Sequence, residues 1–481
     1  MGLRTAEEYL ASLRDGRDVR FRGRRVADVT THEVLGPVAR EHIAGDYRLA
    51  EDPAHRDLAV CEAPGGGLMS RFYKVPTSAD DLLKRRALID LSTRHGKGSV
   101  VLVKEIGSDA LFALTVVAPR VDRAYGTDYA ARVAAFLDHA RTHDLAIAVA
   151  QTDVKGDRSR RPSEQPHPDY YVRIVERRSD GIVIRGAKAH TTNTPFANEV
   201  IVLPTRALGE ADAAYAVACA VPADAKGLRM IASPFGGGGR PGLHHPLSAH
   251  HHLVDTVTLF DDVFVPHERV FLAGEWRAAG DVANTFVQFH RFTAVSYKAP
   301  MLDLIVGAAD LIADYNGIRH ASHVVEKLTR LIAYAETVKG LTELAAIRCR
   351  TTEGGVAVPD VTLTNIAKAH FAANYHTAIR DLQDLAGGLL VTGPDEADLA
   401  DPETGPALRH YLGGRAGVDG EARLKAMNLV RDLAASDFGG YNEILTIHAE
   451  GSLQAQQITI ARDYDLAPAR RYAEELAGLA R

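Results

Sequence analysis

Cysteine is scarce in this sequence, with three among 481 residues. Cys61, Cys219 and Cys349 are odd in number and more than a hundred residues apart. This spacing supports neither a disulfide framework nor a Cys-x-x-Cys metal site. The sequence therefore predicts a protein of a reducing compartment.

Long apolar runs and blocks of like charge are also absent. No stretch approaches the roughly 18 consecutive apolar residues that cross a bilayer, and the segment from Met1 to Leu13 lacks the apolar core of a secretory signal. The formal net charge is only -6, without the basic patch that nucleic acid requires. We therefore expect a cytoplasmic protein that binds neither membrane nor nucleic acid.

Three common motifs are missing as well. The sequence contains no Gly-x-Gly-x-x-Gly after a strand, no Gly-x-x-x-x-Gly-Lys-Ser/Thr and no His-Glu-x-x-His. Dinucleotide-fold, phosphate-loop and zincin functions therefore lack support. What is present is the composition of an ordinary folded protein, with 46% hydrophobic and 25% charged residues.

The apolar pattern divides the chain into three regions. Residues 1–142 show helical spacing, residues 143–278 contain short runs rich in Val, Ile and Tyr, and residues 279–481 return to long helical segments. The connections within the middle region are too short for crossover helices. These features predict an α+β protein with an N-terminal helical domain, a central antiparallel β domain and a C-terminal helical bundle.

Two polar segments of the β region are candidates for a ligand site. The first follows an apolar run, and the second continues a strand into small and short polar residues. Amide, hydroxyl and cationic groups of this kind suit the edge and the phosphates of a flavin, although a solvated turn and a hairpin end are the alternatives. The candidate flavin ligands are Gln151, Thr152, Asp153, Lys155, Arg158, Lys188, His190, Thr191 and Thr192.

A second group of titratable residues opens the C-terminal region. His290, Tyr297 and Lys298 are seven and eight residues apart, so on a helix they share about one face. Asp255, on a predicted strand, faces either solvent or this site. The histidines between His244 and His252 follow a glycine-rich stretch at residues 236–239, which gives no fixed ligand geometry, and we predict no metal site there.

Several motifs together resemble one enzyme family over nearly the whole chain. The family is that of the 4-hydroxyphenylacetate 3-monooxygenase large component, which also contains 4-hydroxybutyryl-CoA dehydratase. The resemblance implies an acyl-CoA-dehydrogenase-like fold, FAD between the β domain and the bundle, and a homotetramer. It lies in Thr5-Ala-Glu-Glu-Tyr-Leu-Ala-Ser-Leu-Arg, Asp28-Val-Thr-Thr-His, Thr152 to Arg158, Asp180-Gly-Ile-Val-Ile-Arg-Gly-Ala-Lys-Ala-His, Phe260-Asp-Asp-Val-Phe-Val-Pro and Ala386-Gly-Gly-Leu-Leu-Val-Thr.

The dehydratase branch holds an iron–sulfur cluster with three cysteines and one histidine. In this chain the histidine corresponds to His290, whereas the cysteine positions carry Val101, Glu105 and Tyr297. A cluster of this kind needs thiolates, so the resemblance implies an enzyme without one. The segments 180–190 and 310–324 nevertheless look closer to the dehydratase branch. A lyase or isomerase function therefore remains an alternative.

The hydroxylase branch holds its phenol with an arginine, a tyrosine and a histidine, and the corresponding places carry Lys104, Ala110 and Val149. The resemblance implies a different substrate from 4-hydroxyphenylacetate, with Lys104 available to an anionic group. Val149, Asp255 and Lys298 are further candidates for substrate contact.

The resemblance favours a two-component monooxygenase that receives reduced FAD from a separate flavin reductase and hydroxylates a small aromatic or related ring. It assigns the substrate side to His290, Tyr297 and Lys104, and His290 to the role of base. A cluster-free dehydratase or isomerase acting on an acyl-CoA is the second hypothesis. A flavin-binding protein without catalysis is the third.

Overall fold

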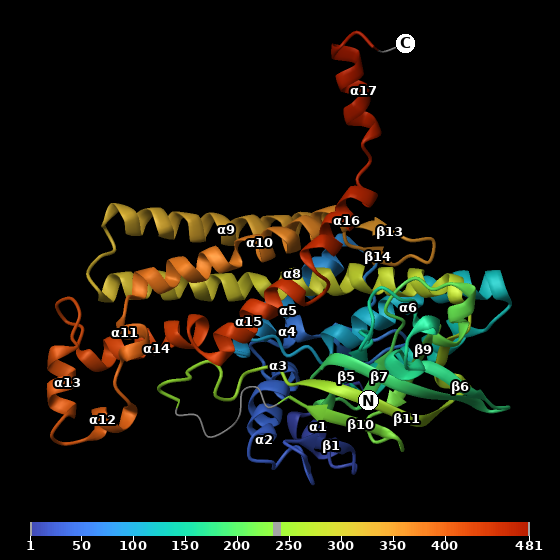
Figure 1. Ribbon diagram of the computed structural model, residues 1–481, viewed down its shortest axis with the longest axis horizontal. Coiled ribbons are helices and arrows are strands. Elements are labelled where there is room, and N and C mark those ends of the chain that lie inside the picture. The colour runs from blue at the N-terminus through green and yellow to red at the C-terminus, as the bar shows by residue number, and fades with distance from the viewer. Residues whose placement is uncertain (1, 234–241, 480–481) are drawn as a thin grey trace.

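The computed structural model describes residues 2–233 and 242–479. Figure 1 shows a β region at the lower right, with the N-terminal helices beside it and the long C-terminal helices above. This order of helices, strands and helices agrees with the three regions predicted from the sequence. None of the helices in the described ranges combines the length and apolar character needed to cross a membrane.

The N-terminal region is mainly helical. Thr5 and Glu8 form the capping box that begins the first helix. One long helix, α6, was not singled out by the sequence pattern, and its first ten residues are buried on every face. The helices are α1 (Ala6–Ser12), α2 (Leu35–Pro37), a π-helix (Val38–Ile43), α3 (Gly45–Glu51), α4 (Arg56–Ala59), α5 (Ala79–His95), α6 (Glu105–Tyr125) and α7 (Tyr129–Thr142).

The β region consists of two sheets. The six-stranded sheet has the order β2-β1-β10-β11-β7-β6, and the four-stranded sheet has the order β12-β9-β8-β5. The strands of the first are β2 (Arg24–Arg25), β1 (Asp18–Phe21), β10 (Leu228–Ala232), β11 (Asp255–Pro266), β7 (Gly181–Thr192) and β6 (Arg173–Arg177). Those of the second are β12 (Val270–Ala273), β9 (Val217–Pro222), β8 (Glu199–Val202) and β5 (Ile147–Ala150). Two short ribbons, β3 (Val60–Glu62) with β4 (Leu68–Ser70) and β13 (Arg350–Thr351) with β14 (Ala357–Val358), lie outside both sheets.

Two strand pairs depart from the antiparallel arrangement that we predicted. The pairs β1 with β10 and β5 with β8 are parallel, and the other pairs of the two sheets are antiparallel. Both parallel pairs join strands that are far apart in the sequence, so the short connections that suggested antiparallel pairing do not link them. Because β1 belongs to the N-terminal region, residues 1–142 contribute to the central sheet.

The C-terminal region is built on one helix of 40 residues, α8 (Trp276–Tyr315). His290, Tyr297 and Lys298, which the sequence spacing predicted to share a helical face, lie within it. Helix α8 contributes to the core around α6 and the sheets through Phe286 and Phe289, and to the core of the bundle through Leu302 and Ile305. The remaining helices are α9 (Ser322–Ile347), α10 (Val361–Ala386), α11 (Leu389–Thr392), α12 (Glu396–Ala400), α13 (Gly405–Tyr411), α14 (Gly420–Ala434), α15 (Asp437–His448), α16 (Leu453–Asp463) and α17 (Ala467–Leu476).

Candidate functional site

The two polar segments of the β region lie side by side. An isolated antiparallel bridge joins Asp153 to Lys188, and the backbone N–H of Ala189 donates to the carbonyl of Thr152 at 2.9 Å. The loop after β5 and the end of β7 therefore form one continuous edge, as a shared ligand site requires.

Three of the predicted flavin ligands have buried side chains that the protein itself satisfies. Lys188 forms an ion pair with Asp153 at 2.9 Å and donates to the carbonyls of Gln151 and Leu203. The hydroxyl of Thr191 lies within hydrogen-bond distance of two other threonine hydroxyls. These groups fix the two segments together, and the expectation that Asp153, Lys188 and Thr191 contact the flavin stays a prediction.

The remaining predicted ligands are open to a partner. Gln151, Thr152, Lys155 and Thr192 are half-buried, and Arg158 and His190 are exposed. His190 has a φ of 58°, a left-handed conformation that is uncommon outside glycine and that clusters at functional sites.

A concentration of positive charge accompanies this edge. Burial lowers the pKa of Lys155, and the nearby charges of Arg158 and Arg206 lower it further. Such a set of cations attracts phosphates. Arg206 was not singled out in the sequence, because it lies about fifty residues from the two other cations.

Asp255 connects this edge to the C-terminal region. It pairs with Thr192 across β11 and β7, and its Oδ1 accepts from the Thr192 hydroxyl at 2.8 Å. Its Oδ2 accepts from the hydroxyl of Tyr441, on α15, at 2.6 Å. Of the two orientations open to Asp255 in the sequence, the structure therefore has the one that faces the site.

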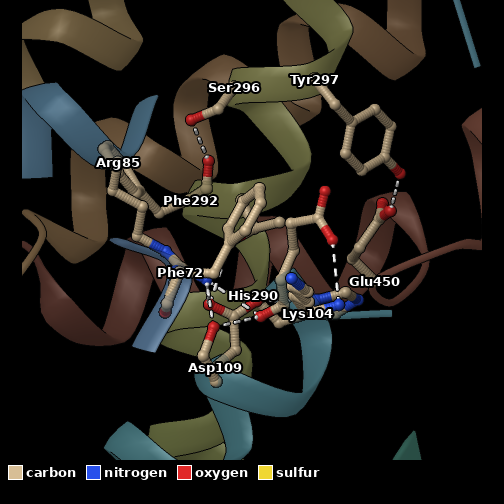
Figure 2. A network of polar contacts seen from close by, with 12 residues as sticks. Phe72, Arg85, Lys104, Asp109, His290, Phe292, Ser296, Tyr297 and Glu450 are labelled. Atoms are coloured by element: carbon tan, nitrogen blue, oxygen red, sulfur yellow. Dashed lines mark hydrogen bonds and ion pairs between the residues drawn. The ribbon is translucent and has the colours of Figure 1, made fainter. Parts of the chain in front are cut away.

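His290 is oriented by a buried carboxylate. Its Nδ1 lies 3.3 Å from Oδ2 of Asp109, on α6, and its ring stacks on Phe286 with 5.1 Å between the centroids. The other carboxylate oxygen of Asp109 accepts from Arg85 at 2.7 Å and from Thr293 at 3.0 Å. Asp109 is therefore held in place while it holds the imidazole (Figure 2).

Two turns further along α8, Tyr297 and Lys298 meet a second carboxylate. Tyr297 points toward Glu450 (Figure 2) and donates a hydrogen bond to its Oε1. Lys298 Nζ lies 3.0 Å from Oε2 of Glu450 and donates to the hydroxyl of Tyr297 at 3.0 Å. Burial opposes the charge of Glu450, but Lys298 and Lys368 outweigh it and lower its pKa to about 2. The carboxyl of Glu450 is thus ionised.

The turn between α15 and α16 directs Glu450 inward. Glu450 has a φ of 54° and Gly451 a φ of 96°. A Cβ atom at position 451 would lie 2.8 Å from a guanidinium nitrogen of Arg291, and Arg291 Nε donates to the Glu450 carbonyl at 2.9 Å. A strained, tightly packed turn is therefore needed to place this carboxylate beside Tyr297.

The three positions that correspond to the phenol-binding residues, Lys104, Ala110 and Val149, are buried. Lys104 has no exposed side-chain surface, lies 2.8 Å from Asp144 and sits over the ring of Tyr47. Val149 and Ala110 pack in the hydrophobic core. The protein encloses the side chains of Lys104 and Val149, and their contact with a substrate stays a prediction.

The four positions that correspond to cluster ligands have separate partners. Val101 packs in the N-terminal core, His290 faces Asp109, and Tyr297 faces Glu450. Glu105 lies beside Asp46, and burial together with the Asp46 charge raises the pKa of Glu105 well above its usual range. Val101, Glu105 and Tyr297 carry no thiol, and the absence of a cluster stays a prediction.

We expect Asp46→Asn to stabilise the protein progressively as the pH rises. Burial raises the pKa of Asp46 to about 6, so the folded protein retains a proton that the unfolded chain releases. The wild-type protein therefore loses stability as the pH rises from about 4 to about 6, whereas the Asp46→Asn variant has no carboxyl at this position and does not lose it. In thermal unfolding scans, the gain in Tm over wild type should grow over that range and stay level above it. The exposed Asp138→Asn is the control, and a gain independent of pH would contradict the assignment.

Three of the histidines of residues 244–252 pair with different carboxylates. His245 lies 3.4 Å from Asp432, His250 lies 2.7 Å from Glu41, and His244 lies 3.2 Å from Asp395. The glycine-rich stretch 236–239 lies outside the described residues. Among the residues that the structure describes, no group of three or more His, Cys, Asp or Glu side chains could hold a metal ion.

The sequence did not indicate several residues of this site. Asp109, Arg85, Lys368, Tyr441 and Glu450 are separated from His290 by 78 to 205 positions. The one available signal was Asp109 itself, an acidic residue within the apolar run of α6, since buried carboxylates are rare unless they are paired.

Comparisons with known proteins agree with this architecture. Residues 5–272 match the model of the 4-hydroxyphenylacetate 3-hydroxylase N-terminal region, and residues 279–478 match that of its C-terminal region. The chain is 34% identical over 499 aligned positions to 4-hydroxybutyryl-CoA dehydratase/vinylacetyl-CoA-Delta-isomerase of Clostridium aminobutyricum, covering 99% of this chain and 100% of that protein.

Two further proteins represent the oxygenases. The chain is 30% identical to the 4-hydroxyphenylacetate 3-monooxygenase oxygenase component of Thermus thermophilus, covering 92% of this chain and 90% of that protein. A crystal structure of the oxygenase component HpaB complexed with FAD superposes with a TM-score of 0.90 at 28% identity, covering 98% of each chain. These matches and the two family models together show that the chain belongs to the 4-hydroxyphenylacetate 3-hydroxylase (HpaB) family.

Proposed function

We propose that this protein is the oxygenase component of a two-component monooxygenase, which uses reduced FAD to hydroxylate a small aromatic or related ring. The observation that carries the proposal is the buried Asp109–His290 pair. A histidine whose Nδ1 is held by a carboxylate keeps Nε2 available as a base.

The residues present fit a flavin. Thr152, Thr192 and Gln151 offer donors and acceptors along one edge, and Lys155 and Arg158 suit its phosphates. When bound, reduced FAD would supply the electrons that activate oxygen. The proposal includes a flavin reductase as partner and a homotetrameric assembly.

The chain's own residues prepare the substrate. His290 takes the proton of the ring hydroxyl, and Asp109 holds the imidazole and stabilises the charge that it gains. Helix α8 keeps His290 and Tyr297 on one face, so both groups lie on the substrate side. The burial of Asp109, Tyr297 and Glu450 excludes water from the proton-transfer groups.

The direct test supplies the protein with reduced FAD and oxygen, and screens para-substituted phenols for a hydroxylated product by mass spectrometry with ¹⁸O₂. One labelled oxygen atom per product is expected. If the flavin is reoxidised and hydrogen peroxide is the only product formed with every phenol tested, the result would count against this function.

Similarity to the dehydratase supports a second candidate, a cluster-free dehydratase or isomerase acting on an acyl-CoA. The chain covers all of that relative at 34% identity, and Tyr297, Lys298 and Glu450 could exchange protons at carbon. Anaerobic incubation of the FAD-loaded protein with 4-hydroxybutyryl-CoA or vinylacetyl-CoA, without any reductase, tests it. Turnover under these conditions would select this activity over the oxygenase.

A further inference from the structure

The cluster around Glu450 contains more positive than negative charge. Lys298 Nζ lies 3.0 Å and Lys368 Nζ 3.7 Å from the same oxygen, Oε2 of Glu450. The side chains of these lysines are 2% and 0% exposed. Two ammonium groups therefore share one carboxylate inside the protein, an arrangement that favours loss of a proton from one of them.

The two lysines differ in their other contacts. Lys368 also donates to the backbone carbonyl of Thr446 at 3.0 Å, which stabilises its charged form. Lys298 instead faces the hydroxyl of Tyr297, a group that can both donate and accept. Burial lowers the pKa of Lys298 to about 7, with the Lys368 charge adding to the effect and Glu450 opposing it. Burial lowers the pKa of Lys368 as well, but the contacts of Lys298 favour its neutral form more than those of Lys368 do.

The other groups around Lys298 come from four elements. Helix α8 contributes Tyr297, His290 and Arg291, and α10 contributes Lys368 and the ring of Phe371, 5.4 Å from Nζ. Beyond Tyr297 lie Asp255 of β11 and Tyr441 of α15, which act on Tyr297 electrostatically. Tyr297 therefore stands between the buried lysines and the flavin edge of the β region.

Aromatic hydroxylation needs a second proton transfer besides that of the ring hydroxyl. When an oxygen atom is inserted at a ring carbon, the proton of that carbon must leave before the ring becomes aromatic again. His290 already carries the hydroxyl proton in the proposed reaction, so another acceptor is required.

We propose that Lys298 accepts this second proton through Tyr297, and that Lys368 and Glu450 are positioning residues that set the charge of Lys298. The bond between the ring carbon and its hydrogen breaks, its electron pair returns to the ring, and the proton passes to the Tyr297 oxygen. Tyr297 gives its own proton to neutral Lys298, which becomes an ammonium group. This inference rests on the proposed hydroxylation.

Opposite shifts of the pH profile test the assignment. The rising limb of kcat/KM near pH 7 should move up by about one unit in Lys368→Met, which removes a like charge, and down by a similar amount in Glu450→Gln, which removes the opposite charge. The matched control Lys368→Arg keeps the charge and should leave the limb in place. A role confined to packing would lower activity without these opposite shifts, and that result would overturn the proposal.

A second measurement does not depend on turnover. The ¹⁵Nζ resonance of Lys298, assigned by its loss in Lys298→Arg, should titrate near pH 7 in the wild-type protein and at higher pH in Lys368→Met. A resonance that stays in the ammonium form up to pH 9 overturns the inference even if the enzyme hydroxylates phenols. If no phenol is hydroxylated but the titration behaves as stated, the proposed function fails while the charge state of Lys298 stands.

Discussion

His290→Ala is expected to lower the rate of hydroxylated product formation about 10²–10⁴-fold, the usual contribution of a general base. The imidazole is held by Asp109 at 3.3 Å and stacked on Phe286, so its loss removes an oriented proton acceptor. The polar edge formed by Gln151, Thr152 and Thr192 does not involve His290. FAD binding and oxidation of reduced FAD by oxygen should therefore persist, and peroxide should replace the hydroxylated product.

Asp109→Asn provides the matched variant. It keeps the size of the side chain and the bonds from Arg85 and Thr293, but an amide cannot stabilise a protonated imidazole as a carboxylate does. We expect a smaller loss of product than in His290→Ala, again with flavin oxidation intact. Rapid mixing of each variant with reduced FAD and oxygen, followed by product analysis, gives both rates. Unchanged hydroxylation in His290→Ala would remove this residue from the mechanism.

The two polar segments of the β region could be identified from the sequence, whereas the groups around His290 and Tyr297 could not. Gln151 to Arg158 and Lys188 to Thr192 are local segments in which small and polar residues are crowded together, so the pattern is visible without the fold. In the structure, Lys188 and Asp153 pair with each other. Which residue of a polar segment faces the ligand depends on the register of the strands. The register cannot be read from the composition of the segment.

The residues that orient His290 and Tyr297 could be identified only from the fold. Asp109 and Glu450 reach α8 from elements on either side of it in the sequence, and only their packing brings them together. The same holds for the parallel pairing of β1 with β10, which joins residues about two hundred positions apart.

Lys104→Met is expected to destabilise the folded protein by about 3–5 kcal/mol, the usual result of removing one partner of a buried ion pair. Lys104 and Asp144 are both 0% exposed and 2.8 Å apart, so the variant leaves a buried carboxylate without its cation. The ammonium group also loses its position 3.6 Å from the centroid of the Tyr47 ring. Thermal and urea unfolding at neutral pH measure the loss.

Two further variants separate a structural role from the substrate contact implied by the resemblance. Asp144→Asn should destabilise in the same way, and the double variant Lys104→Met with Asp144→Asn should lose less than the sum of the two, because it leaves no unpaired charge. Lys425→Met, at an exposed pair on α14, should change Tm by about 1 °C at most. If Lys104→Met instead kept its Tm and only raised KM, the ammonium group would be reaching a ligand, and the buried pair with Asp144 would not be its main role.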